Sequence, residues 1–243
     1  MAETPEIHVL DHKVRLLQAA GGFRTSMDSV FLAAACKAEK GARVLDLGAG
    51  VGGASFCLLW RVEDSRLTGV EIQESHAALA RENITLNRME GRAEFVCADI
   101  RAYAAETPFD HVICNPPYLE AGTYTQAASL ERATALGHRC EDVTLDDWIK
   151  AGFRNLRSGG SFTMIQRADK VDRIIQAMGR KFGAVEIIPL YPRLGEEAKR
   201  VIVRAVKDRK TPARLHAGII LHNEDGSDTE AARAILRDGA PIG

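Results

Sequence analysis

The sequence lacks the features that mark a membrane-spanning, secreted or zinc-binding protein. No run of about 18 uncharged apolar residues is present, and the first residues do not form a charged-then-apolar leader. The five cysteines stand apart without a C-x-x-C pair, and the seven histidines form no H-E-x-x-H pattern. We therefore expect a soluble, cytoplasmic protein that holds no metal ion and no disulfide framework and does not bind a membrane.

The length and composition are those of one large folded domain. The chain has 243 residues, of which 46% are hydrophobic, enough to bury a full core. No repeat, low-complexity tract or linker divides it. We expect a single domain over residues 1–243, with a helical lead-in over 1–40, a catalytic core over 41–207 and a C-terminal extension over 208–243.

The formal net charge of -1 hides a strongly basic segment. Residues 150–215 contain 16 Lys or Arg and 6 Asp or Glu, which gives this segment a balance of +10. Such an excess favours a polyanionic partner, because neutralising phosphates dominates the affinity of proteins for nucleic acid. Ordinary solvated helix faces would have the same composition, so both interpretations stay open.

Predicted strands and helices alternate along the chain. Short apolar runs indicate strands, and longer periodic segments indicate helices. The strands are predicted at residues 43–47, 67–70, 94–98, 110–114, 161–166, 185–190 and 200–206. The helices are predicted at residues 27–35, from 53 to about 60, 74–87, 144–156 and 170–181. This alternation predicts an α/β, Rossmann-like fold whose sheet is mainly parallel and has helices on both faces.

Two places have the spacing of a capping box, in which an N-cap residue and the residue three positions later bind each other's backbone. Thr144 and Asp147 have this spacing, and so do Ser227 and Glu230 near the C-terminus. We expect a helix to begin at each of these places.

A glycine-rich loop follows the first predicted core strand. Gly48 and Gly50 would let a ligand approach the backbone at the carboxyl end of that strand. With Gly53 they also satisfy G-x-G-x-x-G, and Glu71 lies about 20 residues further on, as in enzymes that bind nicotinamide dinucleotides. Glycine spacing alone therefore leaves a methyl donor, a dinucleotide and a purely structural turn as alternatives.

Three carboxylates favour S-adenosylmethionine among these ligands. Asp46 precedes the glycine loop, while Glu71 and Asp99 follow the next two strands. We expect Asp46 near the positively charged methionine end, Glu71 at the ribose hydroxyls and Asp99 at the adenine amino group. Asp46 would repel the pyrophosphate of a dinucleotide. The predicted donor site comprises these carboxylates and the neighbouring Gly48, Ala49, Gly50, Ile72, Ile100 and Asn115.

The four residues Asn115-Pro116-Pro117-Tyr118 follow the fourth core strand and form the predicted catalytic loop. The lone pair of an exocyclic amino nitrogen is delocalised, and two hydrogen-bond acceptors can localise it for methylation. We expect the Asn115 side-chain oxygen and the Pro116 carbonyl to be these acceptors, held by the two rigid prolines. Tyr118 would offer a face on which a base can stack. A rigid turn with a core tyrosine is the structural alternative.

The motifs at 46–50 and 115–118 resemble those of amino-methyltransferases with an N-P-P-Y/F loop, whose seven-stranded sheet has an antiparallel last strand. Two outer segments, 22–34 and 221–230, resemble the bacterial valine-tRNA adenine-N6 methyltransferase family. This resemblance implies S-adenosylmethionine-dependent N6-methylation of an adenine in RNA, most simply tRNA near the anticodon. It also implies that the upstream helix lies over the donor, with Phe23, Arg24 and Asp28 at its methionine end.

Two other functions are compatible with parts of the sequence. Enzymes that methylate a glutamine in peptide release factors resemble this chain through the same loop, but they carry a helical domain ahead of the glycine loop. Only about 40 residues precede Arg43 here, too few for such a domain. A nucleic-acid-binding module without catalysis is disfavoured by the intact Asn115, and DNA by the lack of a further domain. The insertion at 119–142 is a candidate lid.

Overall fold

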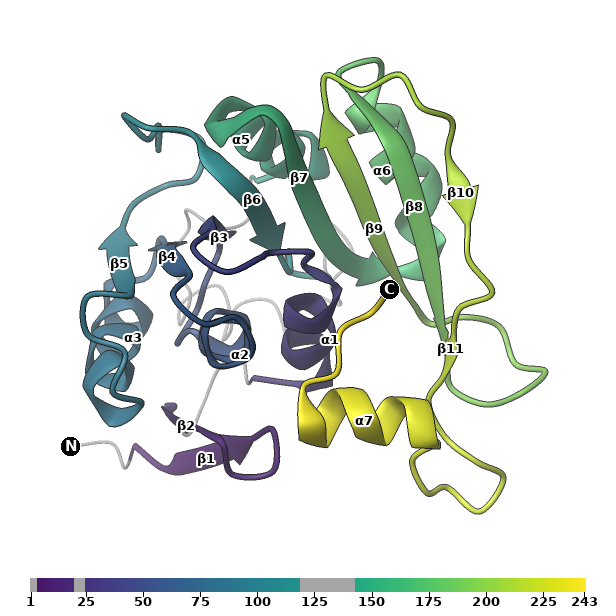
Figure 1. The fold of residues 1–243 in the computed structure, drawn as a ribbon, viewed down its shortest axis with the longest axis horizontal. Coiled ribbons are helices and arrows are strands. Elements are labelled where there is room, and N and C mark those ends of the chain that lie inside the picture. Colours follow the sequence, from purple (N-terminus) through teal and green to yellow (C-terminus); the bar gives the residue numbers. More distant parts are fainter. Residues whose placement is uncertain (1–3, 20–24, 119–142) are drawn as a thin grey trace, which may run out of the picture.

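The computed structural model describes residues 4–19, 25–118 and 143–243, and one sheet of nine strands runs through it (Figure 1). Its strands are β3 (Arg43–Leu47), β4 (Arg66–Glu71), β5 (Ala93–Cys97), β6 (Phe109–Cys114), β7 (Leu156–Arg167), β8 (Phe182–Tyr191), β9 (Arg200–Lys207), β10 (Arg214–Leu215) and β11 (Ile219–Ile220). Their order is β10-β8-β9-β7-β6-β3-β4-β5, with β11 beside β8. All seven predicted core strands are therefore present.

Strand β9 runs antiparallel to both of its neighbours, β7 and β8. The other strand pairs of this sheet are parallel. Strands β3 to β9 thus form the predicted seven-stranded, mainly parallel sheet, in which the last strand along the chain is antiparallel. Strands β10 and β11 were not predicted, because each has only two residues and leaves no periodic pattern in the sequence.

Helices cover both faces of the sheet, as predicted (Figure 1). They are α1 (Met27–Ala35), α2 (Gly53–Arg61), α3 (Glu74–Leu86), α5 (Leu145–Asn155), α6 (Val171–Met178) and α7 (Glu230–Asp238), with the short 3-10 turn η1 (Ala168–Lys170) before α6. Residues of α1, α2, α3 and α7 share one hydrophobic cluster with Ile113 and Ile165 of the sheet. Residues of α5 and α6 share another with Val112 and Met164. Because successive strand residues point to opposite faces, each central strand contributes side chains to the hydrophobic clusters on both faces of the sheet.

None of the described helices has both the length and the apolar content needed to cross a bilayer.

The carboxyl ends of β3 and β6 lie side by side in the middle of the sheet. The register pairs Asp46 with Ile113 and Leu47 with Cys114, so the two strands end at the same level. From β3 the sheet continues through β4 to β5 on one side, and from β6 through β7 to β9 and β8 on the other. Ligands of open α/β sheets bind where the connections diverge in this way. The glycine loop and the loop that starts at Asn115 both leave the sheet at this point.

The N-terminal segment folds as an antiparallel β-hairpin made of β1 (Glu6–Val9) and β2 (Val14–Leu17). Among the described residues of the lead-in predicted over 1–40, only α1 is an α-helix, and the hairpin was not predicted. Leu10, Asp11 and His12 in its turn all have positive φ. Hairpin turns of this kind usually carry glycine or asparagine, so the sequence holds no turn signal here.

Two asparagines one turn apart, Asn83 of α3 and Asn87 at its C-cap, hold β2 in place. The Asn83 side chain accepts a hydrogen bond from Leu17 N (2.7 Å) and donates one to Leu17 O (3.1 Å). Asn87 makes the same pair of bonds with the backbone of Arg15. Asn83 is fully buried and also donates to Val51 O in the glycine loop, at 3.0 Å. One side-chain amide therefore connects the hairpin, α3 and the glycine loop.

The predicted helix starts are confirmed at one place and shifted at the other. At α5 the capping box of Thr144 and Asp147 is present with both of its hydrogen bonds. At α7 the N-cap is Thr229, whose hydroxyl accepts a hydrogen bond from a backbone N–H of the first turn at 3.1 Å. The predicted cap, Ser227, is wrong because its hydroxyl donates to the Asp225 carboxylate in the preceding turn, at 2.6 Å.

Replacing Asn83 with alanine should lower the free energy of unfolding by about 3 kcal/mol, because it leaves half-buried backbone groups of Leu17 and the buried carbonyl of Val51 unpaired, at about 1–3 kcal/mol each. Urea denaturation followed by circular dichroism measures this change. Thr85→Ala, an exposed position on the same helix, should change the value by less than about 0.5 kcal/mol. Equal effects of the two variants would contradict the role assigned to Asn83.

Candidate active site

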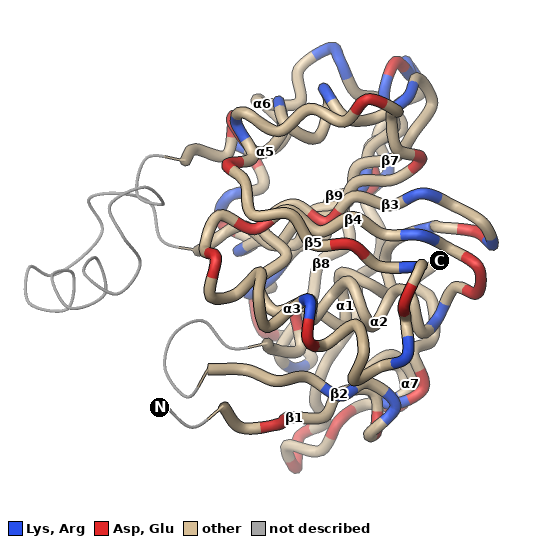
Figure 2. The backbone as a smooth tube through the Cα atoms, turned by 90° about the vertical axis from the view of Figure 1, so that its left-hand side faces the viewer, with Lys and Arg blue, Asp and Glu red and all other residues tan. Residues whose placement is uncertain are grey.

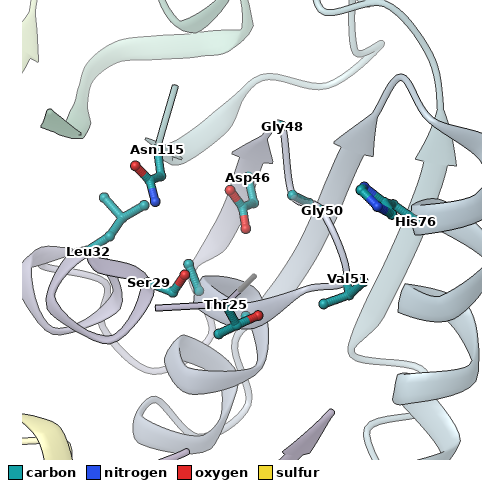
Figure 3. A pocket seen from close by; sticks show the side chains of 12 residues that line it. Thr25, Ser29, Leu32, Asp46, Gly48, Gly50, Val51, His76 and Asn115 are labelled. Carbon is teal, nitrogen blue, oxygen red and sulfur yellow. The ribbon is translucent and has the colours of Figure 1, made fainter. Parts of the chain in front are cut away.

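A pocket lies between the N-terminal end of α1 and the loop that follows β3 (Figure 3). Five predicted site residues border it, namely Asp46, Gly48, Ala49, Gly50 and Asn115. The other lining residues are Thr25, Ser29, Leu32, Val51, Gly53, Ala54 and His76. The structure therefore brings the glycine loop and the first residue of the predicted catalytic loop to one pocket.

Gly48 and Gly50 are needed for different reasons. Both have positive φ, 68° and 56°, which favours glycine over other residues. A Cβ atom on Gly48 would lie 2.5 Å from the Trp148 ring of α5, so packing against α5 requires a glycine there. A Cβ atom on Gly50 would meet no described atom within 4 Å. The open space in front of Gly50 is what a ligand at the backbone requires.

Glu71, the last residue of β4, supports the glycine loop. One carboxylate oxygen accepts a hydrogen bond from Gly50 N and the other from Gln73 N, both at 2.9 Å. The residue is only 6% exposed. An ionised carboxylate has about four acceptor positions, so these two bonds leave room for hydroxyl groups of a ligand. Its contact with ribose hydroxyls stays a prediction.

Asp46 lies near the end of β3, 2% exposed, and receives a hydrogen bond from the Ser55 hydroxyl of α2 at 2.6 Å. Burial, together with the nearby charge of Glu71, raises the pKa of Asp46 to about 7, although the Ser55 bond acts in the opposite direction. A cationic group beside Asp46 would favour its ionised form. The site is therefore suited to the positively charged end of a ligand.

Glu71 does not line this pocket, and neither do three other residues of the predicted donor site. Asp99, which follows β5, accepts hydrogen bonds from the backbone N–H of Arg101 at 2.8 Å and from its guanidinium at 2.6 Å. Ile100 is buried and Ile72 is half-buried. The contacts of these three residues with the donor stay predictions.

Of the two upstream residues of the predicted donor site, the structure describes Asp28. Arg24, like Phe23, lies outside the described residues. Asp28 lies on α1 and is buried, and its carboxylate accepts hydrogen bonds from the Tyr118 hydroxyl and from Arg200 Nε, the latter at 3.3 Å. Its place at the methionine end of the donor stays a prediction.

Asn115 lines the pocket and carries an acceptor that no described residue pairs. Its Oδ1 atom is buried and has no hydrogen-bond partner among residues 4–19, 25–118 and 143–243. Figure 3 shows the Asn115 side chain and the Asp46 carboxylate bordering the same space. Buried acceptors normally have a donor, so this oxygen indicates a ligand with an N–H or O–H group.

The Pro116 carbonyl, the second predicted acceptor, has a protein partner. Gln166 Nε2 donates a hydrogen bond to it at 3.4 Å, from a side chain that is 2% exposed near the end of β7. Since a carbonyl oxygen has two lone pairs, the second remains available to a substrate. Gln166 therefore restrains the orientation of this carbonyl.

Several residues of the site were not identified from the sequence. Ser29 and Leu32 lie three positions apart on the helix predicted over 27–35, and helical spacing could have indicated that they share a face. His76 and Gln166 carry no such signal, because each is a single polar residue in an otherwise ordinary segment.

Comparison with known families decides between the possible ligands. The model of the methyltransferase small domain matches residues 24–190 of the chain. The chain belongs to this family. The prediction of a methyltransferase is thereby confirmed, and with it S-adenosylmethionine as the cofactor. A dinucleotide-binding enzyme is excluded as the interpretation of the glycine loop.

Individual relatives align with most or a large part of the chain. A tRNA1(Val) (adenine(37)-N6)-methyltransferase from Shewanella halifaxensis is 30% identical over 153 residues, which are 62% of this chain and 60% of that protein. The protein of the same name from Shewanella baltica is 28% identical over 223 residues, 89% of this chain and 92% of its own length. A solved structure from Agrobacterium tumefaciens, described as a predicted O-methyltransferase, has a TM-score of 0.73 and 29% identity and covers 89% of this chain and 98% of its own.

The residues of this methyltransferase fit its cofactor. Asp46 offers a negative charge, Glu71 offers unused acceptor positions, and Gly50 leaves its backbone open. When bound, S-adenosylmethionine supplies an electrophilic methyl group on a sulfonium. The protein's own contribution is to bind and orient the groups around it. The described residues contain no cluster of three or more His, Cys, Asp or Glu that could hold a metal ion.

The raised pKa of Asp46 should make stability fall with rising pH. The folded protein keeps the Asp46 proton up to about pH 7, whereas the unfolded chain loses it near the ordinary pKa of 3.8. The free energy of unfolding therefore declines between pH 3.8 and about pH 7 and levels off at higher pH. The decline is at most about 4 kcal/mol. Asp46→Asn removes this titration, and its unfolding free energy, measured by urea denaturation at several pH values, should decline less. Parallel curves for the two proteins would refute the assignment.

Proposed function

We propose that this methyltransferase modifies N6 of an adenine in RNA, most simply in tRNA. The observation that carries the proposal is the buried Oδ1 atom of Asn115, which lacks a hydrogen-bond partner among the described residues and belongs to a side chain that lines the same pocket as the glycine loop. An unpaired buried acceptor costs roughly 1–3 kcal/mol. A substrate amino group at this position would remove that cost by donating to the oxygen.

The chemistry of an amino group matches the two acceptors of the loop. An exocyclic amino group has two N–H donors and a lone pair that is delocalised into the ring. If one N–H donates to Asn115 Oδ1 and the other to the Pro116 carbonyl, the lone pair is localised and turned toward the methyl group. Gln166 stabilises this arrangement because it restrains the Pro116 carbonyl before the substrate arrives.

The names of the relatives and the basic residues near the loop support RNA as the substrate. Both aligned Shewanella proteins are named for adenine 37 of a valine tRNA. Strands β7, β8 and β9 bring Arg167, Lys170, Arg193 and Lys199 to the edge of the sheet at which β6 ends. We call this edge the catalytic edge. Positive charge there would attract the phosphates around a target base.

The basic segment does not form one surface. Arg157, Lys181, Lys207 and Arg209 lie at the opposite edge of the sheet, where β7 and β8 begin and β9 ends. Figure 2 shows Lys and Arg positions at several separate places along the backbone. Only part of the +10 balance therefore lies near the catalytic loop, so charge supports an RNA substrate less strongly than the relatives do.

We further propose that residues 1–243 act as one catalytic domain in the cytoplasm. The hairpin residue Leu16 and the α7 residue Ile235 belong to the same hydrophobic cluster as α1 and α2. This shared core supports a single unit rather than separate lead-in and tail segments. The cytoplasm is where a tRNA substrate would be available.

Isotope-labelled methyl transfer from S-adenosylmethionine to bulk tRNA, DNA and peptide release factor tests the proposed function. We expect label in tRNA, recovered as N6-methyladenosine after nuclease digestion. Asn115→Ala should lower kcat by about 100-fold or more, since it removes an acceptor that acts on the reacting nitrogen. Asn223→Ala changes an exposed turn residue and should retain wild-type activity.

Three outcomes would contradict the proposal. Label in release factor alone would show a glutamine amide as the substrate, which has the same delocalised lone pair. Label on a hydroxyl oxygen would agree instead with the description of the Agrobacterium structure. Binding of RNA and donor without any transfer would indicate a nucleic-acid-binding module.

A further inference from the structure

Tyr118 of the catalytic loop is held by residues of two other elements. Its hydroxyl donates a hydrogen bond to Oδ2 of Asp28 on α1. The guanidinium of Arg200, the first residue of β9, lies over the Tyr118 ring, with its central carbon 4.3 Å from the ring centroid. Arg200 Nε donates to the same Oδ2 atom of Asp28 at 3.3 Å. These three residues form the Asp28/Tyr118/Arg200 cluster.

The members of this cluster depend on one another electrostatically. The Asp28 side chain is 8% exposed, and Arg200 provides the cation that such a buried carboxylate requires. Burial and then the Asp28 charge raise the pKa of the Tyr118 hydroxyl, so the phenol keeps the proton that it donates to Asp28. The flat guanidinium stacks on the ring, which a lysine ammonium cannot do in the same way. Tyr118 is therefore fixed both at its hydroxyl and on one ring face.

The antiparallel direction of β9 brings Arg200 to the catalytic edge. The register pairs Arg200 with Arg167, the last residue of β7, and with Leu190 near the end of β8. If β9 ran parallel to these strands, its first residue would lie at the opposite edge of the sheet. The direction of β9 thus determines which side chain covers Tyr118.

We propose that Arg200 is a positioning residue for the substrate base, an inference that rests on the proposed function. A planar base can stack on Tyr118 only on the face that Arg200 does not cover, so Arg200 selects the side of the ring that receives the base. Asp28 holds the hydroxyl end of the same ring. Because the ring is oriented before the base arrives, less conformational freedom is lost on binding. In this proposal Asp28 acts on the substrate side of the site, which is an alternative to its predicted place at the methionine end of the donor.

Arg200→Lys separates stacking from charge, because it keeps the cation and removes the flat guanidinium. We expect kcat/KM for tRNA to fall roughly tenfold, which corresponds to a loss of about 1.4 kcal/mol of guanidinium stacking, and the dissociation constant of S-adenosylmethionine to stay within about twofold. Asp28→Asn should show the same pattern. The matched control is Arg157→Lys, which alters an arginine paired with Asp110 at 2.6 Å on the opposite edge and should leave both constants unchanged.

A spectroscopic measurement distinguishes positioning from a merely structural role. tRNA with 2-aminopurine at the methylated position reports the stacking of that base through its fluorescence. In Arg200→Lys the fluorescence of the bound complex should differ from that of the wild type, even at saturating protein. A role in folding alone would lower the melting temperature and leave the fluorescence of the bound complex unchanged.

Wild-type kcat/KM in Arg200→Lys would overturn this proposal. So would an Asp28→Asn variant that binds S-adenosylmethionine about tenfold more weakly with an unchanged KM for tRNA. If neither variant folds, Tyr118→Phe tests the proposal, because it keeps the ring and loses only the bond to Asp28. This variant should alter the 2-aminopurine fluorescence of the bound complex. An unchanged fluorescence refutes the proposal. If the wild type methylates a substrate other than RNA, the proposed function fails separately, and the variants are compared by their kcat/KM on that substrate.

Discussion

The adjacency of β3 and β6 is the constraint on which the rest of the site depends. Because the register pairs Leu47 with Cys114, the glycine loop and the Asn115 loop leave the sheet next to each other. The strands beyond β3 and those beyond β6 lie on opposite sides of this point, so the connections lead away from it. Polar side chains can therefore lie at the ends of two buried strands. There a bound ligand can supply the hydrogen-bonding or charged groups that pair with them. The hairpin joins this arrangement through Asn83, which binds the glycine loop at Val51.

The polar residues where β3 and β6 end favour ligand binding at the expense of the stability of the protein without ligand. Asp46 is buried beside Glu71, which makes its ionised form unfavourable in the protein without ligand. Asn115 holds an acceptor that no described residue pairs. Partial compensation comes from Ser55, which donates to Asp46, and from Gln166, which donates to the Pro116 carbonyl of the same loop. Proteins commonly retain such unfavourable groups where function requires them, since a site that satisfied itself would have no place for a ligand.

The sequence was sufficient to predict the core strands and helices, but not the N-terminal hairpin or the start of the last helix. Continuous apolar strands and periodic helices carry a strong signal, and so does a cap such as Thr144, whose partner Asp147 lies in the first turn of its own helix. The cap at Ser227 could not be predicted correctly, because Asp225 competes for its hydroxyl and leaves Thr229 as the N-cap. The hairpin escaped prediction because residues without a turn preference, such as Leu10, adopt positive φ under tertiary packing.

The same distinction explains which site residues the sequence could identify. Asp46 lies near the end of β3, and Gly50 and Asn115 lie in the loops after β3 and β6, whose ends meet. Local patterns and the topology of the fold are therefore enough to bring these residues together. Gln166 and Arg200 contact the catalytic loop from β7 and β9, and their contacts depend on the register of those strands and on the direction of β9. A predicted antiparallel last strand places the first residue of β9 at the catalytic edge, but only atomic positions show a guanidinium over an aromatic ring. Strand β9 therefore contributes to the site through its direction as much as through its sequence.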